Sequence, residues 1–150
     1  MTERGVLRGA RGRIMAAIMA GIIPRGGAFS VGAADYDLLP MAETFIRSMN
    51  PAFRFGFPFL LFYIQIAAMF RYGRPLTKCT EEEASSFLKR FETSRFFYKR
   101  MIILALKMIT FVSFYDIDEN AALIGYHHLK HVRGEGRLAI IRMSREEYEI

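Results

Sequence analysis

Three histidines near the C-terminal end are the residues best suited to bind a metal ion. They are His127, His128 and His131. On a helix, His127 and His131 lie one turn apart on one face, where two imidazole rings can bind the same ion. No further ligands stand at a recognisable spacing nearby. We therefore expect exposed histidines after a helix end and keep His127 and His131 as the only metal candidates. A small metal-binding or redox protein is accordingly one function hypothesis.

Other residue types with potential chemistry do not make a recognisable site. Gly26, Gly27 and Gly32 follow no predicted strand, and no Gly-Lys-Ser/Thr sequence comes after them, so they do not match a dinucleotide- or phosphate-binding loop. The single cysteine, Cys79, cannot form an intramolecular disulfide and has no recognisable histidine partner. We expect no catalytic and no cofactor-binding residue in this chain.

Two long segments, residues 55–70 and 101–115, are almost wholly apolar. Wound at 100° per residue, the segment from Arg95 to Tyr115 has all its polar side chains within about 140°, which leaves about 220° apolar. An ordinary surface helix needs an apolar stripe only a little wider than about 100°. The polar residues of the segment from Arg95 to Tyr115 are Arg95, Lys99, Arg100, Lys107, Thr110 and Ser113. Both segments are therefore predicted to be helices that are covered on more than one side.

A membrane-spanning helix is the first alternative for the segment 55–70. A span takes about 20 apolar residues, whereas this segment is shorter, lies between Arg54 and Arg71, and contains Pro58. The second segment carries Lys107 near its middle. We therefore expect no span, and keep a peripheral membrane protein as the second function hypothesis.

The composition favours a single folded domain of 150 residues with a formal net charge of +6. The basic residues are scattered and no nucleic-acid-binding motif accompanies them, so we expect no nucleic-acid partner. Arginines before residues 14–23 imitate a secretory signal, but the sequence after them is a poor cleavage site and no adjacent arginine pair is present. We interpret this segment as a helix and expect a cytoplasmic protein, with export to the periplasm alongside a partner as the alternative.

The whole pattern predicts an all-α fold, an irregular bundle of about five to six helices with an extended C-terminal tail. After the first helix, Asp35 is predicted to cap a helix over residues 36–49, with Leu38, Ala42, Phe45 and Met49 on one face. Asn50 then caps the first apolar helix, which Pro51 opens and Pro58 should kink or divide.

Local signals also place the later helices. Thr80 and Glu83 form a capping box, and an amphipathic helix follows. Its apolar positions are Ala84, Phe87, Leu88 and Phe91. Ser94 is predicted to cap the second apolar helix. A short helix over residues 116–124 ends at Gly125, and the acidic residues at its start serve its dipole rather than catalysis.

The C-terminal residues differ in composition from the rest, which suggests a helical domain over residues 1–126 and an extension over residues 127–150. Within the extension only residues 138–141 are apolar, too few for a helix. We predict an extended arm that adds as a strand to a partner, with Leu138 and Ile140 in the contact.

The sequence resembles the gluconate 2-dehydrogenase subunit 3 family, the small subunits of flavin-dependent dehydrogenase complexes. The similarity is carried by IIPRGG at residues 22–27 and GAAD at residues 32–35. It continues at Phe87-Leu88, Glu92, Ser94-Arg95, Lys107, Tyr115-Asp116 and Gly125-Tyr126, and covers about residues 14–126. The chain departs from the family in lacking a twin-arginine signal and in its added C-terminal segment.

The resemblance implies a non-catalytic accessory subunit that binds and stabilises a large FAD-containing oxidoreductase subunit of the glucose-methanol-choline type. FAD would belong to that partner, and a cytochrome or iron-sulfur protein would be a further electron-carrying partner. Such binding would cover the excess apolar surface. The residues predicted at the partner interface are Pro24, Arg25, Phe57, Phe59, Phe62, Met69, Arg95, Leu138 and Ile140.

Overall fold

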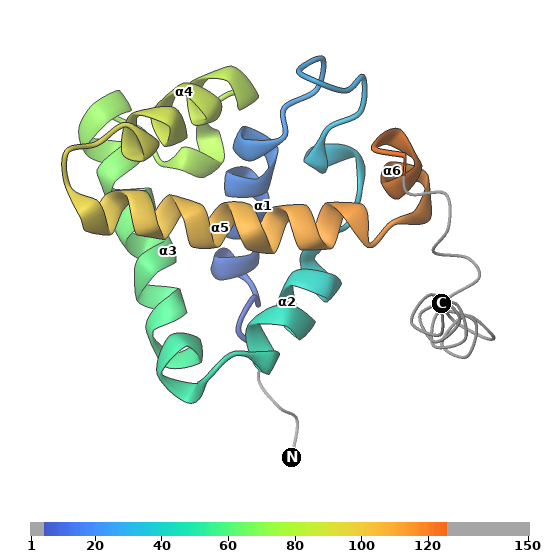
Figure 1. Cartoon of the computed structure of the whole chain (residues 1–150). Helices are drawn as coiled ribbons and strands as arrows, with labels where there is room; N and C mark the ends of the chain where they lie inside the picture. The colour runs from blue at the N-terminus through green and yellow to red at the C-terminus, as the bar shows by residue number, and fades with distance from the viewer. Residues whose placement is uncertain (1–4, 126–150) are drawn as a thin grey trace, which may run out of the picture. The chain divides into compact units, whose positions relative to one another are not determined.

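The computed structural model describes residues 5–125, and every regular element in this part of the chain is helical (Figure 1). The predicted all-α fold is therefore confirmed. In chain order the elements are α1 (Ala10–Ile22), the 3-10 turn η1 (Ala33–Asp35), α2 (Leu39–Ser48), α3 (Pro51–Tyr72), the 3-10 turn η2 (Leu76–Lys78), α4 (Glu81–Glu92), α5 (Phe97–Tyr115) and α6 (Asp118–Leu123).

The chain divides into two compact units, of which the first ends at Phe114 and the second starts at Tyr115. In the first unit α1 is the central helix, since α2, α3, α4 and both 3-10 turns pack on it. Its side chains Met15 and Ile18 are fully buried. The close approach of α1 to α4 depends on Gly21, because a Cβ atom built there would lie 2.9 Å from the Ala84 Cβ.

The second unit contains α6 in its described part. This short helix has Asp118 and Glu119 in its first turn, and Gly125 follows it with a φ of 84°. The predicted short helix before a terminating glycine is confirmed, as is the position of its acids at the positive end of the dipole.

Two predicted helix starts are confirmed in atomic detail. The Asn50 side chain accepts a hydrogen bond of 2.7 Å from the Phe53 N–H at the start of α3. At the start of α4, the Thr80 hydroxyl accepts from the Glu83 N–H at 3.3 Å, and the Glu83 carboxylate accepts from the Thr80 N–H at 2.9 Å. The four predicted apolar positions of α4 are all buried.

Two other predicted caps are wrong. Helix α2 starts at Leu39 with Leu38 as its N-cap, while Asp35 belongs to η1 and accepts a hydrogen bond from the Gly32 N–H. Helix α5 starts at Phe97, and the Ser94 hydroxyl accepts only from the Phe96 N–H, before the helix begins. Each side chain instead accepts a hydrogen bond from a backbone N–H group in the turn before its helix, because short polar side chains bond locally in turns as readily as at caps.

The predicted buried face of α2 and the predicted break in α3 also need correction. In α2, Ile46 is fully buried, whereas Phe45 is only half-buried. Helix α3 continues through Pro58, so the proline does not divide it, while the alternative of a kink at Pro58 stays a prediction. The predicted arm over residues 127–150 lies outside the described residues, and so do its contact residues Leu138 and Ile140 and the three histidines His127, His128 and His131.

Candidate protein-interaction surface

Helix α3 is apolar on two opposite sides. Its buried residues are Phe57, Leu61, Ile64 and Ala68. A second set of apolar residues starts two positions before the first buried residue and repeats with the same spacing. It therefore lies about 200° around the helix from the buried set. This set, the α3 outer face, comprises Phe55, Phe59, Phe62, Ile66 and Met69, which are between 44% and 77% exposed. One side of α3 therefore belongs to the core while the other lies in solvent.

The prediction that Phe57 lies at a partner interface is wrong. Phe57 is 1% exposed and its ring lies 5.5 Å from that of Phe53. The other interface residues predicted in α3 are exposed, Phe59 at 66%, Phe62 at 44% and Met69 at 49%. Phe57 stands two positions from Phe59, and that half-turn shift takes its side chain to the core side.

Helix α5 has the same two-sided character. Its outer face comprises Phe97, Met101, Leu104, Met108 and Phe111, which are between 38% and 59% exposed. The α5 outer face spans about 21 Å, since a helix rises about 1.5 Å per residue. Its inner face is buried and comprises Ile103, Leu106, Ile109, Thr110, Ser113 and Phe114.

Two polar residues of α5 lie on the buried side. Thr110 donates a hydrogen bond to the Leu106 carbonyl at 2.8 Å, and Ser113 donates to the Ile109 carbonyl at 2.7 Å. Because each hydroxyl is satisfied within the helix, it can be buried without an external partner. As a result, many apolar side chains of α5 face solvent, while its polar residues Thr110 and Ser113 face the core.

The charged side chains that α3 and α5 themselves carry are all positive. Neither residues 44–79 nor residues 93–115 contain an aspartate or glutamate. On α5, Lys107 Nζ lies 2.7 Å from Glu92 Oε1 of α4, and Arg100 donates to the Ser94 carbonyl at 3.0 Å. Arg95, a predicted interface residue, is exposed in the α4–α5 connection. The surroundings of the α5 outer face thus suit an acidic partner.

The predicted interface residues Pro24 and Arg25 lie in the loop after α1. Pro24 is half-buried, and the exposed Arg25 bonds to two carboxylates, with its Nε 2.7 Å from Asp35 Oδ1 and its backbone N–H 3.0 Å from Glu81 Oε2. The hydrogen bond from the Gly32 N–H, followed by the Arg25 guanidinium, holds the pKa of Asp35 below its ordinary value. This network ties the loop to the start of α4, which indicates a structural role for Arg25.

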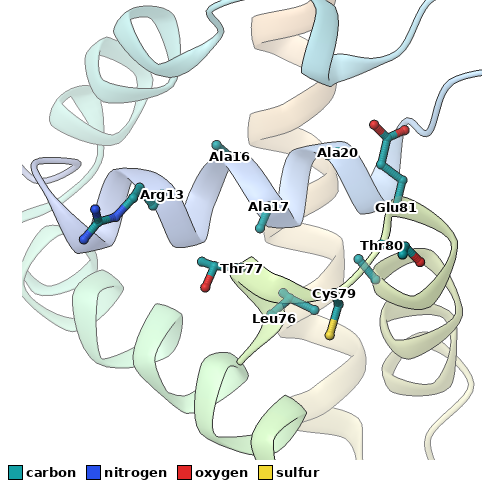
Figure 2. A pocket seen from close by; sticks show the side chains of 10 residues that line it. Arg13, Ala16, Ala17, Ala20, Leu76, Thr77, Cys79, Thr80 and Glu81 are labelled. Carbon is teal, nitrogen blue, oxygen red and sulfur yellow. The ribbon is translucent and has the colours of Figure 1, made fainter. Parts of the chain in front are cut away.

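A shallow groove of about 370 Å³ runs between α1, η2 and the start of α4 (Figure 2). Arg13 and Glu81 lie at its opposite ends, and alanines of α1 line one wall. Cys79 also lines the groove, and its thiol donates to the Pro75 carbonyl at 3.6 Å. Within residues 5–125 no three histidine, cysteine, aspartate or glutamate side chains gather to hold a metal ion.

Helix α3 is longer than the apolar segment 55–70 that it contains, because it starts at Pro51 and ends at Tyr72. Its 22 residues are long and apolar enough to cross a membrane, and 22% of its most apolar window is buried in the protein. Length and composition alone are weak grounds for a span, since core helices of soluble proteins also satisfy them.

No protein-family model, curated protein or solved structure matches this chain. The resemblance to the gluconate 2-dehydrogenase subunit 3 family therefore stays a prediction based on its motifs. Of the residues on the two outer faces, only Phe59, Phe62 and Met69 were predicted at the interface, and the others were not. Their regular spacing of four and three residues marks an apolar face on each helix, but the buried residues of α3 repeat with the same spacing, so this signal does not tell which face is exposed.

Proposed function

We propose that this chain is a non-catalytic accessory subunit that binds a larger protein through the outer faces of α3 and α5. The observation that carries the proposal is the exposure of ten large apolar side chains on two helices whose opposite sides are already buried. Soluble monomers seldom expose contiguous apolar patches of this kind, whereas obligate subunits cover them on assembly.

The partner that we propose is a large FAD-containing oxidoreductase subunit of the glucose-methanol-choline type. The resemblance at residues 22–27 and 32–35 supports this choice. In the structure these two motifs meet, since Arg25 of the first bonds to Asp35 of the second. The chemistry, the flavin and any electron carrier would then belong to the partner chains.

Affinity purification from the cells that encode the protein tests this proposal. The tagged full chain should retain a large protein with a flavin absorption spectrum in stoichiometric amount. A variant with Phe59→Gln, Ile66→Gln, Leu104→Gln and Met108→Gln should lose it. The matched control is Leu123→Gln with Ile124→Gln, which replaces two exposed apolar residues of the second unit. Retention of no flavoprotein by the intact chain would contradict the proposal.

Peripheral membrane binding is the second candidate, favoured by the length of α3 and by the absence of acidic residues from residues 44–79. Basic residues beside an apolar helix attract anionic lipid. Flotation with vesicles of phosphatidylglycerol and phosphatidylcholine tests it directly. Binding that requires phosphatidylglycerol and is lost in the four-residue outer-face variant would favour the membrane, and absence of binding would exclude it.

A further inference from the structure

The α5 outer face has the residue spacing of a coiled-coil seam. From Phe97 its members follow at intervals of four, three, four and three residues, which are the intervals between successive a and d positions of a heptad. No glycine or proline interrupts α5. The α3 outer face has similar spacing, but Gly56 and Pro58 lie within its first turns. Of the two faces, the α5 outer face is the one fitted to a second helix.

The two flanks of the α5 outer face differ in charge. Arg100 and Lys107 each directly precede an outer-face residue, and so occupy the same heptad position, g, on one flank. The other flank, position e, carries the uncharged Tyr98, Ala105 and Val112. Lys107 already pairs with Glu92, but an ammonium group has three donors and can bind a second carboxylate.

This charge pattern disfavours a second copy of the chain as the occupant. In an antiparallel pair the g positions face one another, which would bring Arg100 and Lys107 against the same basic residues of the other copy. In a parallel pair g faces e, where the basic residues would meet Ala105 and Val112 and gain no ion pair. A helix with carboxylates at its flanking positions would satisfy both basic residues.

We propose that the α5 outer face binds an amphipathic helix of the partner protein, with apolar residues at heptad spacing and aspartate or glutamate beside them. This inference deepens the proposed function and rests on it. The side chains of Met101, Leu104 and Met108 act as the central knobs of the contact, and Arg100 selects the acidic flank. Methionine suits this role because its flexible side chain adapts to the shape of the opposing helix.

Peptide binding to the full chain provides the test, with fluorescence anisotropy as the readout. The probes are two labelled three-heptad peptides with leucine and isoleucine at the a and d positions, one with glutamate and one with lysine at the flanking positions. The glutamate peptide should bind at least about tenfold more tightly than the lysine peptide, and added salt should reduce the difference. Arg100→Glu should shift the preference toward the lysine peptide.

Matched variants locate the contact. Leu104→Asp with Met108→Asp should weaken binding of the glutamate peptide at least about tenfold, whereas Ile66→Asp with Met69→Asp on α3 should leave it unchanged. Circular dichroism of each variant should show unchanged helical content. Equal affinity for both peptides, equal effects of the α3 and α5 variants, or α5-dependent binding to phosphatidylglycerol vesicles but not to the peptide would overturn the inference.

The affinity purification separates this inference from the proposed function. If a flavoprotein is retained and its retention survives the two α5 substitutions, the accessory function stands and the α5 contact is wrong. If no flavoprotein is retained but the glutamate peptide binds as expected, the α5 contact stands and the proposed partner is wrong.

Discussion

Phe57 and Phe59 stand two residues apart in α3, yet one is 1% exposed and the other 66% exposed. The difference follows from helix geometry, since two residues correspond to about 200° of rotation. Burial of a phenylalanine in a packed core contributes stability through both transfer from water and close contacts. A solvent-exposed phenylalanine contributes little to the stability of the fold.

Alanine substitution should separate these two roles. We expect Phe57→Ala to lower the free energy of unfolding by about 3–5 kcal/mol, because a cavity replaces a buried ring. Phe59→Ala should change it by no more than about 0.5 kcal/mol. Urea denaturation followed by circular dichroism measures both values. Similar losses of stability in the two variants would show that the assignment of core and outer side is wrong.

Glu43 anchors the segment that precedes α1. Its carboxylate accepts hydrogen bonds from the backbone N–H groups of Val6 and Leu7, each at 2.7 Å, and from Arg47 Nε at 2.9 Å. Partial burial acts to raise the pKa of Glu43, but the hydrogen bonds from Arg47, Leu7 and Val6 outweigh it and lower the pKa. The anchor is therefore strongest when the carboxylate is ionised.

The stability of the chain should accordingly depend on pH through Glu43. Because its pKa is lower in the folded chain than the value of about 4.3 expected when unfolded, ionised Glu43 stabilises the fold above that pH. The contribution is lost as the pH falls through the folded-state pKa. Glu43→Gln should lower the free energy of unfolding at pH 7 by roughly 1–2 kcal/mol, with a smaller difference at acidic pH.

Glu82→Gln is the matched control for this measurement, since Glu82 is an exposed glutamate in the first turn of α4. Denaturation curves at several pH values should show a pH-dependent difference from the unmodified chain for Glu43→Gln that exceeds the difference for Glu82→Gln. A loss of stability in Glu43→Gln that is the same at every pH would argue against the charge as its cause.

At the scale of the elements, two glycines have opposite effects. The close packing of α1 against α4 requires a glycine, whereas a glycine inside α3 weakens that helix. Gly21 lets the backbones of α1 and α4 approach, since an added Cβ would meet the Ala84 Cβ at 2.9 Å and the Leu88 Cδ1 at 3.0 Å. Gly56, on the exposed side of α3, has open space where a Cβ would lie. The first glycine is required by packing, whereas the second only weakens its helix.

The same substitution at these two positions should have opposite effects. Gly21→Ala should destabilise the chain by about 1–3 kcal/mol, because α1 and α4 must move apart. Gly56→Ala should stabilise it by about 0.5–1 kcal/mol, because alanine favours the helix. Thermal unfolding measures both. Stabilisation by Gly21→Ala would show that α1 and α4 lie further apart than described.

At the scale of the whole molecule, the outer faces of α3 and α5 should govern solubility. The full chain expressed without a partner should self-associate, since side chains such as Phe55 and Phe59 would lie in water. The four-residue outer-face variant should be monomeric with unchanged helical content. Analytical ultracentrifugation and circular dichroism test both expectations. A monodisperse monomer of the unmodified chain would weigh heavily against an obligate interface.

The sequence by itself determined that the fold is helical, and it determined the starts of α3 and α4, because the signals for those two starts are local. Asn50 before Pro51, and Thr80 three residues before Glu83, each cap a helix through side chains that reach only their own first turn. The excess of apolar residues in α3 and α5 was equally visible, since it requires only counting around a helix. These signals were sufficient for the all-α fold and for the expectation of an interface.

Only the tertiary structure decided which sides of α3 and α5 face the core. A helix that is apolar over most of its circumference offers several sides of similar hydrophobicity, so its periodicity does not specify the buried one. The choice depends on where the neighbouring helices lie, and it turned Phe57 inward and left Phe59 outside. It also buried Thr110, because the hydroxyl could bond to the helix's own backbone.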